Sequence, residues 1–148
     1  MAWELYASEL ERITAEFPGT VERRFFGAFP DDGISPATVV YTCKLSQLVT
    51  YQVGVTRVLT YFGLAEDFIR TAFENFAGGI TEGALIESSR AMFKGLPALR
   101  FLMQVGQILD LRGIATLKGR TLYFLTLMHL RGTEQEFERF CAAFQIDP

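Results

Sequence analysis

The chain has 148 residues, of which 49% are hydrophobic, 21% are charged and 14 are phenylalanine. This composition can form a full core and excludes a disordered chain, and the length predicts a single domain over residues 1–148. The formal net charge is −3, and the basic residues are spread along the chain. This argues against sequence-independent binding of nucleic acid, which needs clustered positive charge.

The first part of the chain has the pattern of strands. Residues 3–7 are a short strand candidate, and residues 12–17 alternate between apolar and polar side chains. The apolar positions share one face: Ile13, Ala15 and Phe17. Pro18-Gly19 ends this segment with turn chemistry. Residues 20–26 resume an extended pattern, and we expect Val21 and Phe25 to point inward.

Residues 29–36 have the composition of a loop, with Asp31-Asp32-Gly33 as a turn. Those carboxylates could hold a cation weakly, but the ligand series of a calcium loop is absent. Two long strands follow, over residues 38–44 and 48–62. The second has one apolar and one polar face, which predicts an antiparallel sheet with only one face fully covered.

Residues 64–76 change to a helical period. One apolar stripe comprises Phe68, Ile69, Ala72, Phe73 and Phe76. Glu66 and Asp67 fall in the first turn, where acidic side chains suit the helix dipole, and Gly78-Gly79 ends the helix. These two acidic residues therefore need no further explanation than a structural one.

Strand patterns return after this helix. We expect strands over residues 84–93, 98–105, 113–118 and 120–130. A break is expected at Gly95-Leu96-Pro97 and a tight turn at Lys118-Gly119. Residues 98–105 place Leu99, Phe101, Met103 and Val105 on one face, although Leu99, Leu102 and Met103 would also suit a helix.

The last element is predicted to be a helix. Thr133 and Glu136 have the spacing of a capping box, in which each side chain accepts from a backbone N–H at the helix start. One apolar stripe follows: Phe137, Phe140, Cys141 and Phe144. The order of strands, helix, strands and helix predicts an α+β fold with a largely antiparallel sheet flanked by helices.

The order of these pieces resembles the PsbP-like family, which includes the extrinsic photosystem II subunit, a Ran-binding nuclear-import factor and small bacterial proteins of unknown role. The features that carry the resemblance are these: Trp3 and Tyr6 before a strand ending in Phe17-Pro18-Gly19, the strand pair and Phe-rich helix, Phe93-Lys94-Gly95-Leu96-Pro97-Ala98, Lys118-Gly119-Arg120-Thr121-Leu122-Tyr123-Phe124-Leu125, and the last helix ending in Phe144. The resemblance implies an α/β/α sandwich and a binding role. It transfers no functional residue.

The sequence assigns no catalytic, cofactor-binding or metal-binding residue, and we expect no cofactor. The one histidine, His129, is expected to share a strand face with Leu127 and Arg131, without a carboxylate partner to make it a base. Cys43 and Cys141 are expected to be reduced and unpaired, with Cys141 a small core residue. No P-loop and no G-x-G-x-x-G that opens a helix is present.

The leading hypothesis is therefore a non-enzymatic protein-interaction module. The alternative is a binder of a small apolar ligand in a cavity between the sheet and the Phe-rich helices. We expect another protein as partner, leave a homodimer open, and expect no nucleic acid and no membrane span. With no signal peptide in the sequence as given, we expect a cytoplasmic location, although a trimmed leader would leave the same pattern.

Overall fold

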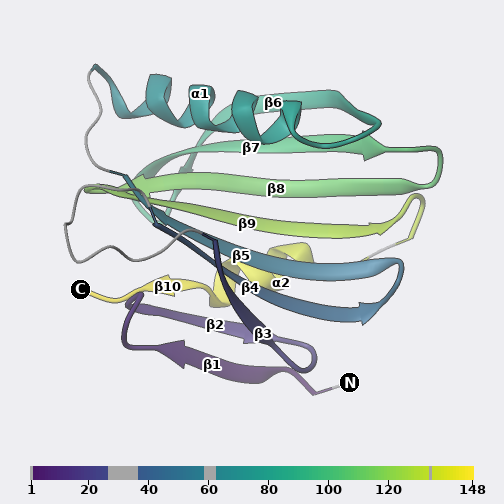
Figure 1. Cartoon of the computed structure of the whole chain (residues 1–148), viewed down its shortest axis with the longest axis horizontal. Coiled ribbons are helices and arrows are strands. Elements are labelled where there is room, and N and C mark those ends of the chain that lie inside the picture. Colours follow the sequence, from purple (N-terminus) through teal and green to yellow (C-terminus); the bar gives the residue numbers. More distant parts are fainter. Residues whose placement is uncertain (1, 27–36, 59–62, 134) are drawn as a thin grey trace.

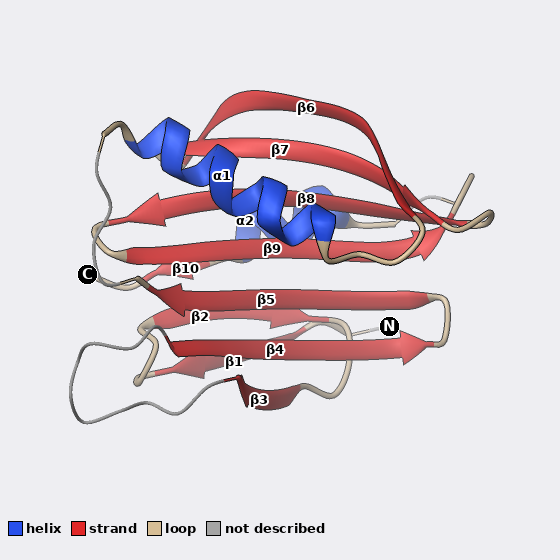
Figure 2. Cartoon of the chain, turned by 45° about the horizontal axis from the view of Figure 1, so that its top comes forward, coloured by secondary structure: helices blue, strands red, loops and turns tan. Residues whose placement is uncertain are grey.

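The fold is a layered arrangement of two sheets and two helices, as the computed structural model in Figure 1 shows. The structure describes residues 2–26, 37–58, 63–133 and 135–148. One helix covers one face of a seven-stranded sheet, and the second helix lies with a three-stranded sheet on the other face (Figures 1 and 2). The predicted α+β class with a largely antiparallel sheet and helices on both sides is confirmed.

The larger sheet is antiparallel at each of its neighbouring pairs. Its spatial order is β3 (Glu22–Phe26), β4 (Ala37–Ser46), β5 (Val49–Arg57), β9 (Thr121–Leu130), β8 (Leu109–Lys118), β7 (Leu96–Val105) and β6 (Gly83–Phe93). In β4 and β5 nearly all side chains of the apolar face are buried, while most of those on the polar face are half-buried. The prediction that these strands have one fully covered face is confirmed.

The smaller sheet packs under the larger one. It consists of β1 (Glu4–Ser8), β2 (Ile13–Phe17) and β10 (Gln145–Ile146), with β2 in the centre. Ile13, Ala15 and Phe17 are buried and their polar neighbours are half-buried, as the alternation predicts. The two chain ends are joined here, because β10 pairs with β2.

Helix α1 (Ala65–Gly78) packs mainly on β7 and contacts β6 and β8. Ile69 and Phe73 of its apolar stripe are fully buried, and the ring of Phe73 lies 4.5 Å from that of Phe101. The predicted helix, its acidic first turn and its end at Gly78-Gly79 are confirmed. No helix of the described residues has the length and apolar character needed to span a membrane.

Helix α2 (Phe137–Ala143) confirms the predicted stripe, since Phe137, Phe140, Cys141 and Phe144 are all buried. The predicted capping box is wrong, because the helix begins at Phe137 and Glu136 takes the N-cap position without a side-chain cap. The Glu136 carboxylate instead accepts from Trp3 Nε1 at 3.0 Å. The Thr133 hydroxyl donates to the carbonyl of Leu130 at 2.6 Å. Glu136 thus has a partner just before β1 and Thr133 has one at the end of β9, and these contacts replace local capping.

Two predicted turns are displaced along the chain. Phe93 pairs with Leu96, so the break lies at Lys94-Gly95, while Leu96 and Pro97 belong to β7. Lys118 pairs with Thr121, so the second turn is Gly119-Arg120.

Strand boundaries and one facing residue also differ from the prediction. Strand β7 rules out the helical alternative for residues 98–105, and β8 begins four residues earlier than expected, at Leu109. Phe25 is 50% exposed instead of inward, because β3 is an edge strand and the Arg23 guanidinium covers the ring at 4.1 Å. The expected loop over residues 29–36, with Asp31-Asp32-Gly33, and the end of the 48–62 strand lie outside the described residues.

Candidate functional site

His129 on β9 has both ring nitrogens committed to structural hydrogen bonds. Arg112 Nε donates to its Nε2 at 3.2 Å, so the proton of the neutral ring is on Nδ1, which lies 3.0 Å from the carbonyl oxygen of Leu130. The side chain is buried, as is that of Leu127 on the same face. The cation beside it is Arg112 from β8 and not the expected Arg131, whose Nε donates to Asp110 at 3.1 Å. This arrangement holds the imidazole as a hydrogen-bonded core residue.

Cys43 and Cys141 are both buried and unpaired. Burial raises the pKa of the Cys141 thiol to about 12, which makes the reactive thiolate rare at neutral pH. The described part of the chain contains no cluster of three His, Cys, Asp or Glu side chains that could hold a metal ion. Neither cysteine therefore has the environment of a nucleophile or a metal ligand.

A polar cluster joins the β1–β2 loop to the edge of the larger sheet. Glu11 forms an ion pair with Arg23, accepts from the Ser8 hydroxyl, and is 3% exposed at its side chain. Arg23 Nε in turn donates to the Tyr41 hydroxyl at 3.2 Å. Each member is satisfied by another, which is typical of a structural network rather than of a binding site.

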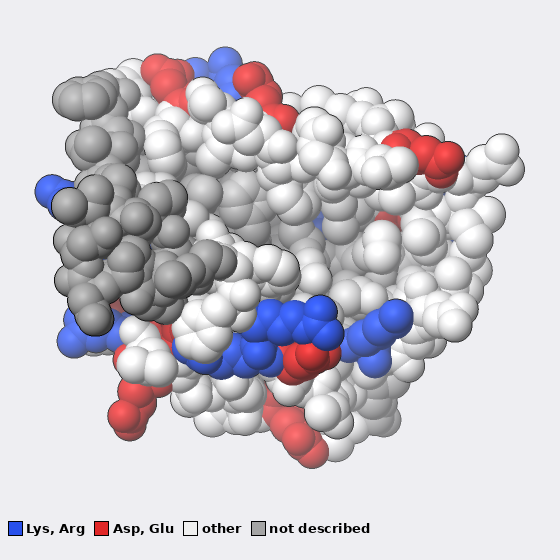
Figure 3. Space-filling model, in the orientation of Figure 1, with Lys and Arg blue, Asp and Glu red and all other residues white. Residues whose placement is uncertain are grey.

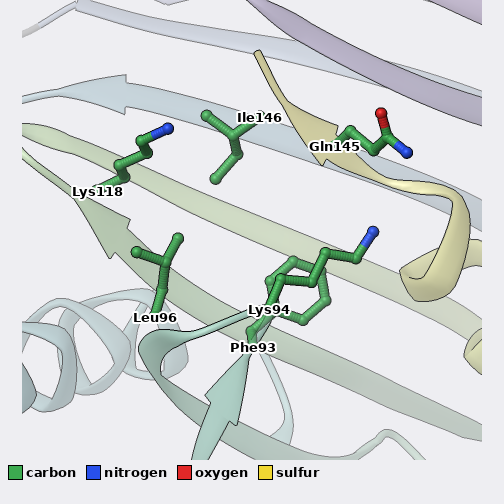
Figure 4. Close-up of a pocket in the computed structure, with 6 residues that line it drawn as sticks. All are labelled: Phe93, Lys94, Leu96, Lys118, Gln145 and Ile146. Carbon is green, nitrogen blue, oxygen red and sulfur yellow. The ribbon is translucent and has the colours of Figure 1, made fainter. Parts of the chain in front are cut away.

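A groove of about 310 Å³ lies at the turns of the β6–β7 and β8–β9 hairpins. Figure 4 shows the residues that line it: Phe93, Lys94, Leu96, Lys118, Gln145 and Ile146. The Lys118 side chain extends toward Ile146, whereas the Lys94 ammonium bonds the end of α2. A second groove of about 410 Å³ shares Lys118 and Ile146 with it. Both grooves include exposed side chains and are open to solvent.

Strand β6 is the most open element of the structure. Nine of its 11 residues are exposed, and it pairs with β7 alone in the larger sheet. Leu85, Ile86 and Met92 present large apolar side chains that are 50%, 49% and 69% exposed. In Figure 3 many of the Lys and Arg side chains gather in the lower part of the view, in the region of β3 and β4, while the upper rim carries acidic side chains and fewer basic ones.

The pairing with β7 determines which residues of β6 direct their backbone N–H and C=O groups toward β7 and which direct them away. Residues opposite each other in an antiparallel pair alternate between exchanging two hydrogen bonds and exchanging none. Met92 stands opposite Pro97, which has no N–H, so this pair is the kind without hydrogen bonds. The two-residue turn Lys94-Gly95 has positive φ angles at both residues, so the pair Phe93–Leu96 that closes it is hydrogen-bonded. The next pair, Met92–Pro97, therefore exchanges no hydrogen bonds, which agrees with the missing N–H of Pro97.

Because the two kinds of pair alternate along the strand, every second residue of β6, counted back from Met92, directs its backbone N–H and C=O groups away from β7. They belong to Ser88, Arg90 and Met92. The ladder is regular from Glu87 to Phe93 and has a bulge at Ile86. The outward groups form a seven-residue template for another strand, which we call the β6 edge (residues 87–93).

The opposite edge of the sheet lacks this character. Strand β3 has five residues, three of which are the charged Glu22, Arg23 and Arg24. Short length and charge are the usual ways in which proteins protect an edge strand against pairing. The β6 edge cannot be predicted from local sequence patterns, because pairing across the whole sheet decides the strand order and thus which strand lies outermost.

The architecture is that of an α+β sandwich. Among the described residues, the histidine and both cysteines are buried in structural positions. More particularly, the chain has a PsbP-like fold, as the sequence resemblance implies. The solution structure of cyanobacterial PsbP (CyanoP) from Synechocystis sp. PCC 6803 is similar to it with a TM-score of 0.58 and 15% identity, over 97% of this chain and 92% of that one. At this identity the likeness shows the fold alone.

A crystal structure of a protein of unknown function from Pseudomonas aeruginosa gives a TM-score of 0.46 and 14% identity, over 87% of this chain and 83% of that one. No family model matches the sequence. No curated protein matches it either.

Proposed function

We propose that this protein is a non-enzymatic interaction domain that binds a protein partner by strand addition at the β6 edge. The observation that supports this most is the row of outward backbone groups at Ser88, Arg90 and Met92 on the outermost strand. In strand addition, backbone hydrogen bonds provide the affinity and side-chain contacts provide the specificity. Exposed Leu85, Ile86 and Met92 supply the apolar contacts.

The surroundings of the ionisable groups support a binding role over a catalytic one. A general base must reach its substrate and a nucleophile must be exposed and activated. Within the described residues His129 is buried with both nitrogens bonded, and Cys43 and Cys141 are buried.

The alternative, a small apolar ligand between the sheet and α1, finds no specific support. The rings of Phe73 and Phe101 stack where such a ligand would have to lie. Four surface grooves among the described residues have no lining from Phe68, Phe73 or Phe76.

We also propose a reducing, cytoplasmic environment, which the two buried and unpaired thiols suit. Thiol titration of the denatured protein, purified from its host without reductant, should give two free groups. A count of zero would contradict this placement.

The interaction proposal is tested by two variants at one residue. Ser88→Pro removes one outward N–H and leaves the β6–β7 ladder intact, because the N–H of Ser88 does not face β7. Ser88→Ala changes the side chain as much but keeps the N–H. Tagged wild type and Ser88→Ala should co-purify the same host protein, while Ser88→Pro should lose it at an unchanged melting temperature. Equal recovery by all three forms would show that the β6 edge is not the binding site.

A further inference from the structure

We infer that the β6 edge pairs with the β6 edge of a second copy of this chain, antiparallel about a two-fold axis at Ser89. This inference rests on the proposed function, because it names the occupant of the same edge. A two-fold interface must be complementary to itself, so the sequence of β6 decides whether such a pairing is allowed and in which register.

The register follows from charge and apolar character. In a symmetric antiparallel pair one residue stands opposite its own copy, and residues at equal distances on either side oppose each other. An axis at Glu87 or at Arg90 would place like charges directly opposite, which is destabilising. An axis at Ser88 would place Ile86 opposite Arg90.

An axis at Ser89 gives a better match for each exposed side chain. Ile86 then stands opposite Met92, two apolar residues that are 49% and 69% exposed in the single chain. Ser88 stands opposite Arg90, so outward backbone groups meet outward backbone groups. This register therefore lets Ser88 of one chain and Arg90 of the other exchange backbone hydrogen bonds on both sides of the axis. It also covers apolar surface without opposing like charges.

The helices leave room for this pairing. In both views β6 forms the outer strand of the sheet, and in Figure 2 no element lies beyond it. Helix α1 packs mainly on β7, and the two copies of β7 would lie three strand spacings apart, roughly 14 Å. A helix with its side chains is about 10 Å across, so the two copies of α1 would lie beside each other without overlap.

The assembly would close at two chains. Pairing consumes both β6 edges and leaves only β3 at each end of the combined larger sheet. Because β3 is short and carries Glu22, Arg23 and Arg24, it does not extend the ladder. Pairing along one edge buries little surface, so we expect a reversible dimer with a dissociation constant roughly in the micromolar range.

Sedimentation velocity over a range of concentrations tests the association. Wild type and Ser88→Ala should form a reversible dimer, whereas Ser88→Pro should raise the dissociation constant at least tenfold with an unchanged circular dichroism spectrum. Wild type that stays monomeric at all concentrations would overturn the inference, yet leave the proposed function standing if Ser88→Pro alone loses a host partner. Dimerisation of Ser88→Pro equal to that of Ser88→Ala, with equal partner recovery, would overturn both.

Disulfide trapping tests the register. In the proposed dimer the two Ser89 residues form a pair without hydrogen bonds, where the Cα atoms lie about 4.5 Å apart and a disulfide fits. Ser89→Cys should therefore give a covalent dimer on mild oxidation. Glu87→Cys is the matched control, because it stands opposite Ala91 and its own copy lies four residues away. Trapping of Glu87→Cys in preference to Ser89→Cys would overturn the register.

Discussion

The Nζ of Lys94, in the turn between β6 and β7, lies 2.8 Å from the carbonyl oxygen of Ala142 in the last turn of α2. The same ammonium donates to the carbonyl of Phe144. The last turn of α2 has no basic residue of its own, so the cation that suits its negative end comes from a strand turn 48 residues earlier. This contact ties α2 and β10 to the larger sheet.

Replacing Lys94 by Met should lower the free energy of unfolding by about 1–2 kcal/mol, because two carbonyls lose a charged donor while the aliphatic chain is kept. Urea unfolding at neutral pH measures the loss. Lys118→Met is the matched control, since Lys118 lines the same groove but has no ion pair among the described residues. Equal losses in the two variants would show that the Lys94 contact has no specific effect.

Local periodicity accounts for what the sequence predicted well. The alternation of β2 and the stripe of α2 both depend on neighbours within a few residues, and the structure buries those positions. Turn positions were predicted less well. Pro97 indicated a break but lies inside β7, where its missing N–H is tolerated because the pair with Met92 exchanges no hydrogen bonds.

What the sequence could not predict depends on partners distant in the chain. The sequence does not predict the start of β8, because Asp110 and Arg112 have the character of loop residues until Arg131, just after β9, and His129 on β9 become their partners. Phe25 was expected inward because strand order was unknown. The β6 edge was missed for the same reason, since only the assembled sheet shows which strand lies outermost.

Phe140 is the aromatic residue at the centre of the larger core. It is fully buried, with its ring 5.5 Å from Phe17 and 5.2 Å from Tyr51. Phe140→Ala should reduce the free energy of unfolding by about 3–5 kcal/mol, as in other aromatic core truncations. Phe26→Ala, at a position that is 55% exposed on β3, should cost less than about 1 kcal/mol in the same denaturant melts. A loss below about 1 kcal/mol for Phe140→Ala would contradict its central position.

Gly113 on β8 lies directly under an aromatic ring. A Cβ at this position would be 2.1 Å from Cζ of Phe101, so Gly113→Ala should destabilise the protein by about 1–3 kcal/mol through overpacking. Gly54→Ala on β5 is the control, because its Cβ would meet Phe124 at an ordinary 3.7 Å and the strand should tolerate it. Thermal melts compare the two. If Gly113→Ala is no less stable than Gly54→Ala, the close approach of the Phe101 ring is not rigid.

Glu11 should make the fold sensitive to acid. Burial tends to raise the pKa of this carboxyl, but hydrogen bonds from Ser8, Tyr41 and Arg23, together with the charge of Arg23, outweigh burial and lower the pKa below its ordinary value of 4.5. The unfolded chain therefore binds this proton more tightly. The contribution of Glu11 to stability is full above about pH 4.5 and is lost as the pH falls through the folded pKa.

Glu11→Gln should therefore be less stable than wild type at pH 7, and the difference should shrink below pH 4.5. Urea unfolding from pH 7 to pH 3 measures this difference in the free energy of unfolding. Glu9→Gln, two residues away in the same loop and exposed, should follow wild type at each pH. A difference between Glu11→Gln and wild type that stays constant down to pH 3 would mean that the carboxylate is not held ionised by Arg23, and that the cluster stabilises the loop through shape alone.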